Sequence, residues 1–129
     1  YRKFPSDLVL DLCKQENVQF FSVQRDNDVI DLPPGVVDLQ NDLINWEDTA
    51  AVLANMDVVV TSCTSIAHAS AALGVETWVI VPVLPYYIWS LPGEVSPWYP
   101  KVRLFRQSRF GRWDDVADNL SRAFEERFR

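Results

Sequence analysis

The stretch from residue 57 to residue 82 constrains the fold of this 129-residue chain more than any other. Two continuous apolar runs, Val58–Val60 and Trp78–Val81, flank a turn rich in serine and threonine and an alanine-rich segment that ends at Gly74. Apolar residues at every position, rather than at alternate positions, are typical of strands that are covered on both faces in a parallel sheet. The order strand, helix, strand therefore predicts a parallel α/β unit.

The rest of the chain continues this alternation of helices and short apolar strands. Asn45 and Asp48 resemble a capping pair at the start of a helix, and apolar residues recur at helical spacing from Trp113 to Phe128. We expect helices over residues 6–17, 45–55 and 113–128, and strands over residues 18–23, 36–39 and 102–105. The pattern predicts a single α/β domain over residues 1–129, with a Rossmann-like parallel sheet and helices on both of its faces.

Composition excludes several classes of function. The net charge of −6 argues against a nucleic-acid partner, because binding along a duplex requires a basic surface. Cys13 and Cys63 provide neither a disulfide framework nor metal-ligand spacing. No apolar run reaches the length of a membrane span, and the first residues lack the pattern of a signal peptide. We expect a cytoplasmic domain with reduced thiols, no membrane span, no metal and no bound cofactor.

Hydroxyl side chains gather where the strand around Val60 ends and the next helix begins. Ser62, Thr64 and Ser65 lie at this point, and His68 follows Thr64 on the same helix face. Helix amino termini bind anions, and ligands of open α/β sheets sit outside the carboxyl ends of the strands. These residues therefore predict a phosphate site to which His68 donates a hydrogen bond. The alternatives are hydroxyls that only cap the helix and a histidine buried against the sheet on a backbone carbonyl.

Two further segments offer candidate ligand contacts. Gln24 follows the predicted strand of residues 18–23, so it would lie at the same edge of the sheet. Tyr86, Tyr87 and Trp89 belong to a proline-rich connection and either stack on a sugar or base or pack on a neighbouring domain. Dinucleotide, P-loop and serine-elbow motifs are absent from the sequence, so it offers none of the common signatures of redox, ATPase or serine-hydrolase chemistry.

Five sequence blocks resemble a known bacterial module. They are FSVQ (residues 21–24), WEDTAAVLANMDVVV (46–60), TSIAHASAALG (64–74), WVIVP (78–82) and SPWYPKVRLFRQ (96–107). In this order they are similar to the carboxyl-terminal domain of glycosyltransferases fused to tetratricopeptide repeats, relatives of heptosyltransferase-type enzymes with kinship to O-linked N-acetylglucosamine transferases. The resemblance implies the carboxyl-terminal half of a GT-B enzyme, the domain that holds a nucleotide-sugar donor.

The resemblance also implies roles for individual residues. The family's Asp-Thr-x-x-x-His motif falls on Cys63, Thr64 and His68. Thr64 and His68, with the amides around Ser65, would hold the donor diphosphate without a metal, and Gln24 would face the cleft. Cys63 departs from the family's acidic residue, which argues against full transferase activity.

The family's first, central strand would precede Tyr1, so the resemblance implies a piece of a longer protein. The parent would supply an acceptor-side amino-terminal domain and tetratricopeptide repeats, and the chain alone would be inactive. Loss of a central strand would leave unpaired strand edges, through which copies of the chain could self-associate. Two other functions fit the same sequence: a degenerate, non-catalytic scaffold that binds partners through its aromatic loop, and a small phosphate-binding regulatory domain.

Overall fold

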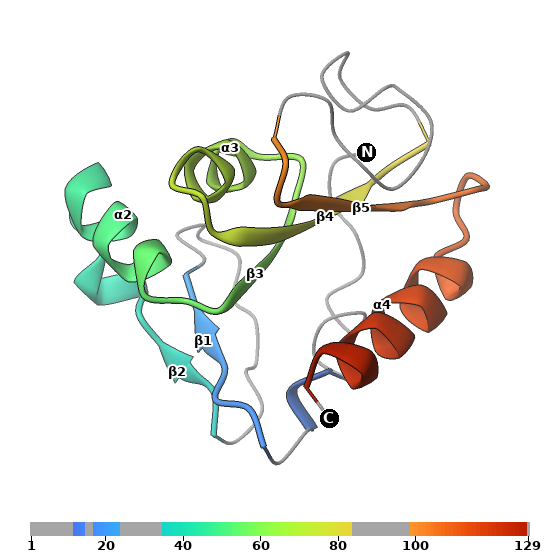
Figure 1. Ribbon diagram of the computed structural model, residues 1–129, viewed down its shortest axis with the longest axis horizontal. Coiled ribbons are helices and arrows are strands. Elements are labelled where there is room, and N and C mark those ends of the chain that lie inside the picture. The colour runs from blue at the N-terminus through green and yellow to red at the C-terminus, as the bar shows by residue number, and fades with distance from the viewer. Residues whose placement is uncertain (1–11, 15–16, 24–34, 84–98, 129) are drawn as a thin grey trace.

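The computed structural model describes residues 12–14, 17–23, 35–83 and 99–128, and it has the α/β architecture that the sequence predicts (Figure 1). Single-turn 3-10 helices cover Leu12–Lys14 and Gln40–Asp42. The other elements are β1 (Phe21–Ser22), β2 (Val37–Asp38), α2 (Trp46–Ala54), β3 (Val58–Ser62), α3 (Ser65–Ala72), β4 (Glu76–Val81), β5 (Val102–Arg106) and α4 (Asp114–Arg127).

The main sheet is parallel and has the strand order β3-β4-β5. Side chains of β4 alternate between the two faces of this sheet. Trp78 and Ile80 belong to the apolar cluster beneath α4, whereas Val79 and Val81 belong to the cluster beneath α3. Figure 1 shows α3 and α4 on opposite sides of the strands. Burial on both faces explains why β4 is apolar at consecutive positions.

Helix α3 packs closely on the sheet because its inward residues are small. Ala67 and Ala71 are buried against the sheet, and the Ser70 hydroxyl lies 2.8 Å from the Thr77 hydroxyl of β4. Both hydroxyls are buried and hydrogen-bonded, so this contact joins α3 to β4 without leaving a polar group unsatisfied. It holds the helix at a defined position over β3 and β4.

Helix α4 covers the opposite face with an amphipathic stripe, as its spacing predicts. Val116, Leu120 and Phe124 are buried, and the Phe124 ring stacks on Phe20 at a centroid distance of 5.6 Å. Phe124 also meets Trp78 edge to face, so α4 joins the region around β1 to the main sheet. None of the helices in the described residues combines the length and apolar character that a membrane crossing requires.

The sheet is divided in the part of the chain that the structure describes. β1 and β2 form a separate parallel pair with Phe21 opposite Val37, and no ladder joins this pair to β3. Phe20 and Val23, which flank β1, nevertheless pack into clusters on the two faces of the main sheet. This arrangement is what the absence of a central strand between β1 and β3 would produce. The prediction of a Rossmann-like parallel sheet that has helices on both faces and lacks its first central strand is thereby confirmed for the described residues.

The lengths of the first two strands differ from the predictions. The strand expected over residues 18–23 is confined to Phe21–Ser22, and that expected over residues 36–39 to Val37–Asp38. A strand ladder extends only as far as its neighbour permits, and here each strand has one short partner within the described residues. Most of the helix expected over residues 6–17 lies outside the described residues, and Leu12–Lys14 forms a 3-10 turn.

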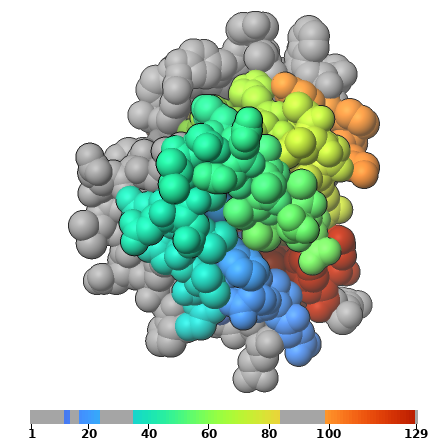
Figure 2. Space-filling model, turned by 90° about the vertical axis from the view of Figure 1, so that its left-hand side faces the viewer, coloured from blue at the N-terminus to red at the C-terminus, as the bar shows by residue number. Residues whose placement is uncertain are grey.

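The predicted capping pair at the start of α2 is confirmed. The side-chain oxygen of Asn45 accepts a hydrogen bond from the Asp48 amide at 2.9 Å, and the Asp48 carboxylate accepts one from the Ile44 amide at 3.2 Å. Figure 2 looks onto the face formed by α2, β2 and β1. Large apolar side chains are exposed in these segments and just before α2: Phe21, Val37, Ile44 and Trp46.

Replacement of Gly74 tests how α3 ends. The Gly74 amide donates to the carbonyl of Ala71 and the Val75 amide to the carbonyl of Ser70, which is the Schellman pattern. Gly74 has a φ of +78°, where a side chain is strained even though the space around it is open. We expect Gly74→Ala to lower the free energy of unfolding by about 1–2 kcal/mol, measured by urea denaturation. Gly74→Asn should lose less, and an unchanged Gly74→Ala would contradict this role.

Acid titration tests the start of α4. The Asp115 carboxylate accepts hydrogen bonds from the Ser108 hydroxyl and the Val116 amide, and the Ser108 bond is the main cause that lowers the pKa of Asp115 from 3.8. Because the pKa is lower in the folded state, the stabilisation is complete above pH 3.8 and disappears as the pH falls through the folded-state value. Asp115→Asn should therefore cost roughly 0.3–1 kcal/mol at neutral pH and progressively less in acid.

Denaturation of this variant at several pH values provides the measurement. Asp118→Asn is the matched control, because Asp118 is exposed on the same helix beyond its first turn. A stability loss at Asp115 that stays the same in acid would contradict the assignment.

Candidate anion-binding site at the carboxyl edge of the sheet

The turn between β3 and α3 presents backbone donors. Thr64 precedes the helix in an extended conformation, and its side chain does not cap the helix. Its hydroxyl lies 3.4 Å from the Thr61 hydroxyl, and its amide donates to the Ser62 carbonyl at 2.8 Å. The Thr64 hydroxyl therefore does not cap the helix, which was one of the alternatives that the sequence left open.

The first turn of α3 carries the partial positive charge of the helix. Amides at the start of an α-helix have no acceptor within the helix, and the described residues provide none for Ser65 and Ile66. Ser65 is exposed, so this end of the helix is open to solvent in the described structure. The two amides and the helix dipole favour an anion at this position.

His68 lies one turn into α3 and is partly buried. Its Nδ1 atom is 3.0 Å from the hydroxyl of Tyr99, and the two rings meet edge to face at 5.8 Å. Nδ1 therefore meets a phenol rather than the backbone carbonyl of the alternative interpretation. Because helical side chains lean toward the amino terminus, we expect the imidazole to lie near the first turn of α3.

Arg106 adds a cation at the same edge, and the sequence interpretation missed it. It ends β5, and the alternation of β5 places it with Val102 and Leu104 on the α3 face. Partial burial lowers the pKa of the guanidinium below its ordinary value, while an electrostatic interaction with Cys63 opposes this shift. The carboxyl end of β5 lies at the same edge of the parallel sheet as the end of β3, after which α3 begins. Arginine stays protonated at neutral pH, so it contributes a positive charge there.

Cys63 and Gln107 lie next to these residues and have structural roles. The buried Cys63 thiol donates to the Ile80 carbonyl at 3.6 Å. The buried side-chain oxygen of Gln107 accepts from the Val83 amide, and the backbone amide of Gln107 donates to the Val81 carbonyl. Gln107 therefore joins the ends of β4 and β5, while Cys63 belongs to the apolar core beneath α3.

The structure brings together only part of the predicted site. Ser65 and His68 lie in the first turn of α3, and Thr64 directly precedes it. Ser62 is partly buried at the end of β3. Gln24, Tyr86 and Trp89 lie outside the described residues. The reasoning that selected Gln24, a polar residue just after a buried strand, would also have found Arg106.

The site offers hydrogen-bond donors and positive charge. Amides, an imidazole and a guanidinium suit a phosphate or diphosphate group. Among the described residues, no group of three or more histidine, cysteine, aspartate or glutamate side chains could hold a metal ion.

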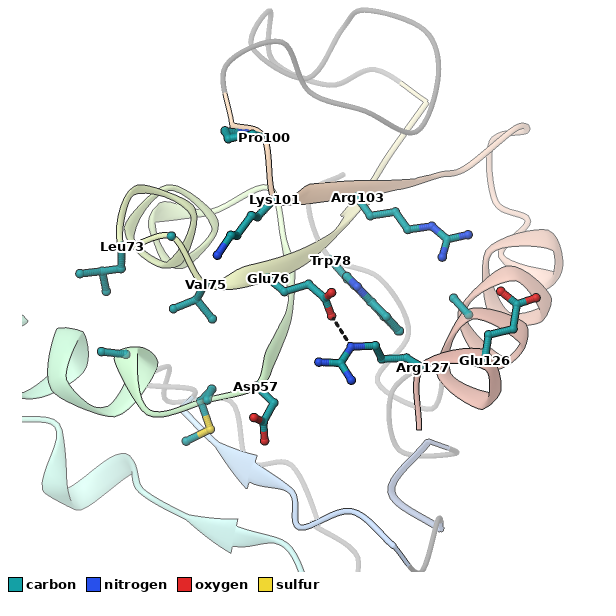
Figure 3. Close-up of a pocket in the computed structure, with 14 residues that line it drawn as sticks. Asp57, Leu73, Val75, Glu76, Trp78, Pro100, Lys101, Arg103, Glu126 and Arg127 are labelled. Atoms are coloured by element: carbon teal, nitrogen blue, oxygen red, sulfur yellow. Dashed lines mark hydrogen bonds and ion pairs between the residues drawn. The ribbon is translucent and has the colours of Figure 1, made fainter. Parts of the chain in front are cut away.

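A hollow of about 880 Å³ opens at the opposite, amino-terminal edge of the sheet (Figure 3). Glu76 and Arg127 form an ion pair across it at 3.1 Å, and Asp57, Lys101 and Arg103 also line it. Its charges are mixed, and ligands of open α/β sheets bind at the other edge. The hollow and the hydrogen-bond donors thus lie at opposite edges of the sheet. The donors at the carboxyl edge are the stronger evidence for a ligand site.

Comparisons with known proteins provide one relative. The chain is 28% identical over 94 residues to Protein FlbA of Caulobacter vibrioides. The match covers 72% of this chain but 15% of FlbA, so the chain corresponds to a small part of that relative. No family model matches the sequence, and no solved structure matches it.

Proposed function

We propose that the carboxyl edge of the main sheet binds the diphosphate of a nucleoside-diphosphate sugar. Three kinds of donor at this edge carry the proposal: the first amides of α3, the imidazole of His68 and the guanidinium of Arg106. They come from two elements that the parallel sheet places at one edge. The five sequence blocks that resemble GT-B glycosyltransferases support the same assignment.

The proposed role is that of the donor-binding half of an inverting glycosyltransferase. Transfer of the sugar develops negative charge on the leaving diphosphate. Preorganised amides and cations at that position stabilise the negative charge that develops in the transition state more than they stabilise the charge of the bound substrate. They therefore lower the barrier without a metal. Gln24, Tyr86 and Trp89 are proposed contacts for the sugar and base.

The complete enzyme would require more than this chain. In the proposal, an acceptor-side domain faces the carboxyl edge of the sheet and tetratricopeptide repeats belong to the same protein. A cytoplasmic location fits the proposed use of a nucleoside-diphosphate sugar. The chain alone would bind the donor without transferring the sugar.

A non-catalytic module is the second candidate, and Cys63 favours it. The position where the resembling family has an acid holds a thiol that is buried and hydrogen-bonded to the Ile80 carbonyl. Such a domain would act as a scaffold rather than a transferase. Thermal shift of the chain with UDP, GDP, ADP and CMP separates the two, because stabilisation by a nucleoside diphosphate supports donor binding. Stabilisation by inorganic phosphate without preference for a base would indicate a phosphate-binding regulatory domain.

Removal of the imidazole tests the predicted role of His68. His68→Ala should weaken binding of the nucleoside diphosphate that gives the largest thermal shift by roughly 1–3 kcal/mol, the range for one charge-assisted hydrogen bond. Isothermal titration calorimetry measures the difference. Ser70→Ala is the control, because it removes a buried hydrogen bond from the same helix away from the site. Equal affinities of wild type and His68→Ala would refute the role of the imidazole.

Arg106 can be tested against an arginine on the same strand. Arg106→Gln removes the cation on the α3 face, whereas Arg103→Gln removes one that lies over the Phe105 ring on the α4 face. We expect Arg106→Gln to weaken diphosphate binding about tenfold, since hydrogen bonds to charged groups contribute roughly 1.5–3 kcal/mol. Arg103→Gln should leave the affinity unchanged. Similar losses in both variants would show that net charge, rather than the site, determines binding.

A further inference from the structure

We propose that Tyr99 is a positioning residue that sets the tautomer of His68, so that the imidazole donates to an anion through Nε2. This inference rests on the proposed function, because the anion is the diphosphate described above. The observation that carries it is the 3.0 Å contact between the Tyr99 hydroxyl and His68 Nδ1. The contact joins α3 to the segment just before β5.

The proposed phosphate contact determines the direction of this hydrogen bond. A neutral imidazole has one nitrogen that donates and one that accepts, whereas a phenol hydroxyl can do either. A phosphate oxygen in its ionised form only accepts, so the ring nitrogen that meets it must carry a proton. Since Tyr99 engages Nδ1, that nitrogen must be Nε2. The consistent arrangement has the hydroxyl donating to Nδ1 and Nε2–H donating to the phosphate.

Tyr99 is well placed to hold the ring. Its side chain packs on the apolar cluster beneath α3, and its carbonyl accepts a hydrogen bond from the Val102 amide at 3.3 Å. The nearby Lys101 carbonyl accepts from the Thr77 amide of β4. The hydroxyl is therefore fixed relative to the sheet, and its contact with Nδ1 holds the imidazole of His68. A ring fixed in one tautomer and one orientation loses less entropy on binding.

The sequence makes this inference directly measurable, because His68 is the single histidine of the chain. Protein labelled with ¹⁵N-histidine has one pair of ring nitrogen signals, and these distinguish a protonated nitrogen from a bare one. Spectra are recorded in mildly alkaline buffer. We expect a protonated Nε2 and a bare Nδ1 in the wild-type chain without ligand.

The test variant is Tyr99→Phe, which removes the hydroxyl and keeps the ring that packs on the core. We expect its ring nitrogen signals to move toward each other as both tautomers become populated, and UDP affinity to fall about fivefold, the effect of one hydrogen bond of ordinary strength. Ser70→Ala is the matched control, since it removes one hydroxyl contact of α3 that does not involve the imidazole. It should retain both the wild-type tautomer and the wild-type affinity.

The outcomes separate this inference from the proposed function. A protonated Nδ1 in the wild type, or ring signals that Tyr99→Phe leaves unchanged, would overturn the role of Tyr99 even if UDP binds. The expected tautomer and its loss in Tyr99→Phe, together with a fivefold loss of UDP affinity, would support both. The expected tautomer without any binding of UDP or phosphate would support the control of the ring by Tyr99 and overturn the diphosphate assignment.

Discussion

Burial of β4 on both faces is the constraint on which the rest of this structure depends. Its alternating side chains supply Trp78 and Ile80 to the cluster under α4, and Val79 and Val81 to the cluster under α3. Neither helix could bury its apolar side without this strand, and the parallel neighbours β3 and β5 take their register from it. The three strands consequently end at one edge, which is where α3 begins.

The candidate site is a consequence of this packing. Small residues let α3 lie close to the sheet, so its first amides stand beside the ends of the strands. Side chains of β5 alternate between the two faces of the sheet, so Arg106 lies on the α3 side and Arg103 on the α4 side. In a chain with a net charge of −6, positive charge and amide donors are thus assembled locally by secondary structure rather than by overall composition. Such local assembly suits a small anionic ligand better than an extended polyanion.

The divided sheet separates a well-packed part from a weakly paired one. β3, β4 and β5 have ladders of five residue pairs each, whereas β1 and β2 pair over two. Phe20 and Val23 hold the β1 region to the main body through side chains rather than through a backbone ladder. Such contacts specify which faces meet but do not define the strand ends, and this explains why the first two strands are shorter than their apolar patterns predict.

The local order of residues determined the strand–turn–helix–strand unit, the capping pair of α2, the end of α3 at Gly74 and the amphipathic α4. Each depends on neighbours within a few positions, through periodicity, capping or a positive φ. The same reasoning placed Thr64, Ser65 and His68 at one helix end. Only the tertiary structure decided that Tyr99 meets His68 and that Arg106 lies on the α3 side of the sheet, because these residues belong to distant parts of the chain. Their placement depends on the register between parallel strands and on the face to which each side chain points, which no local pattern specifies.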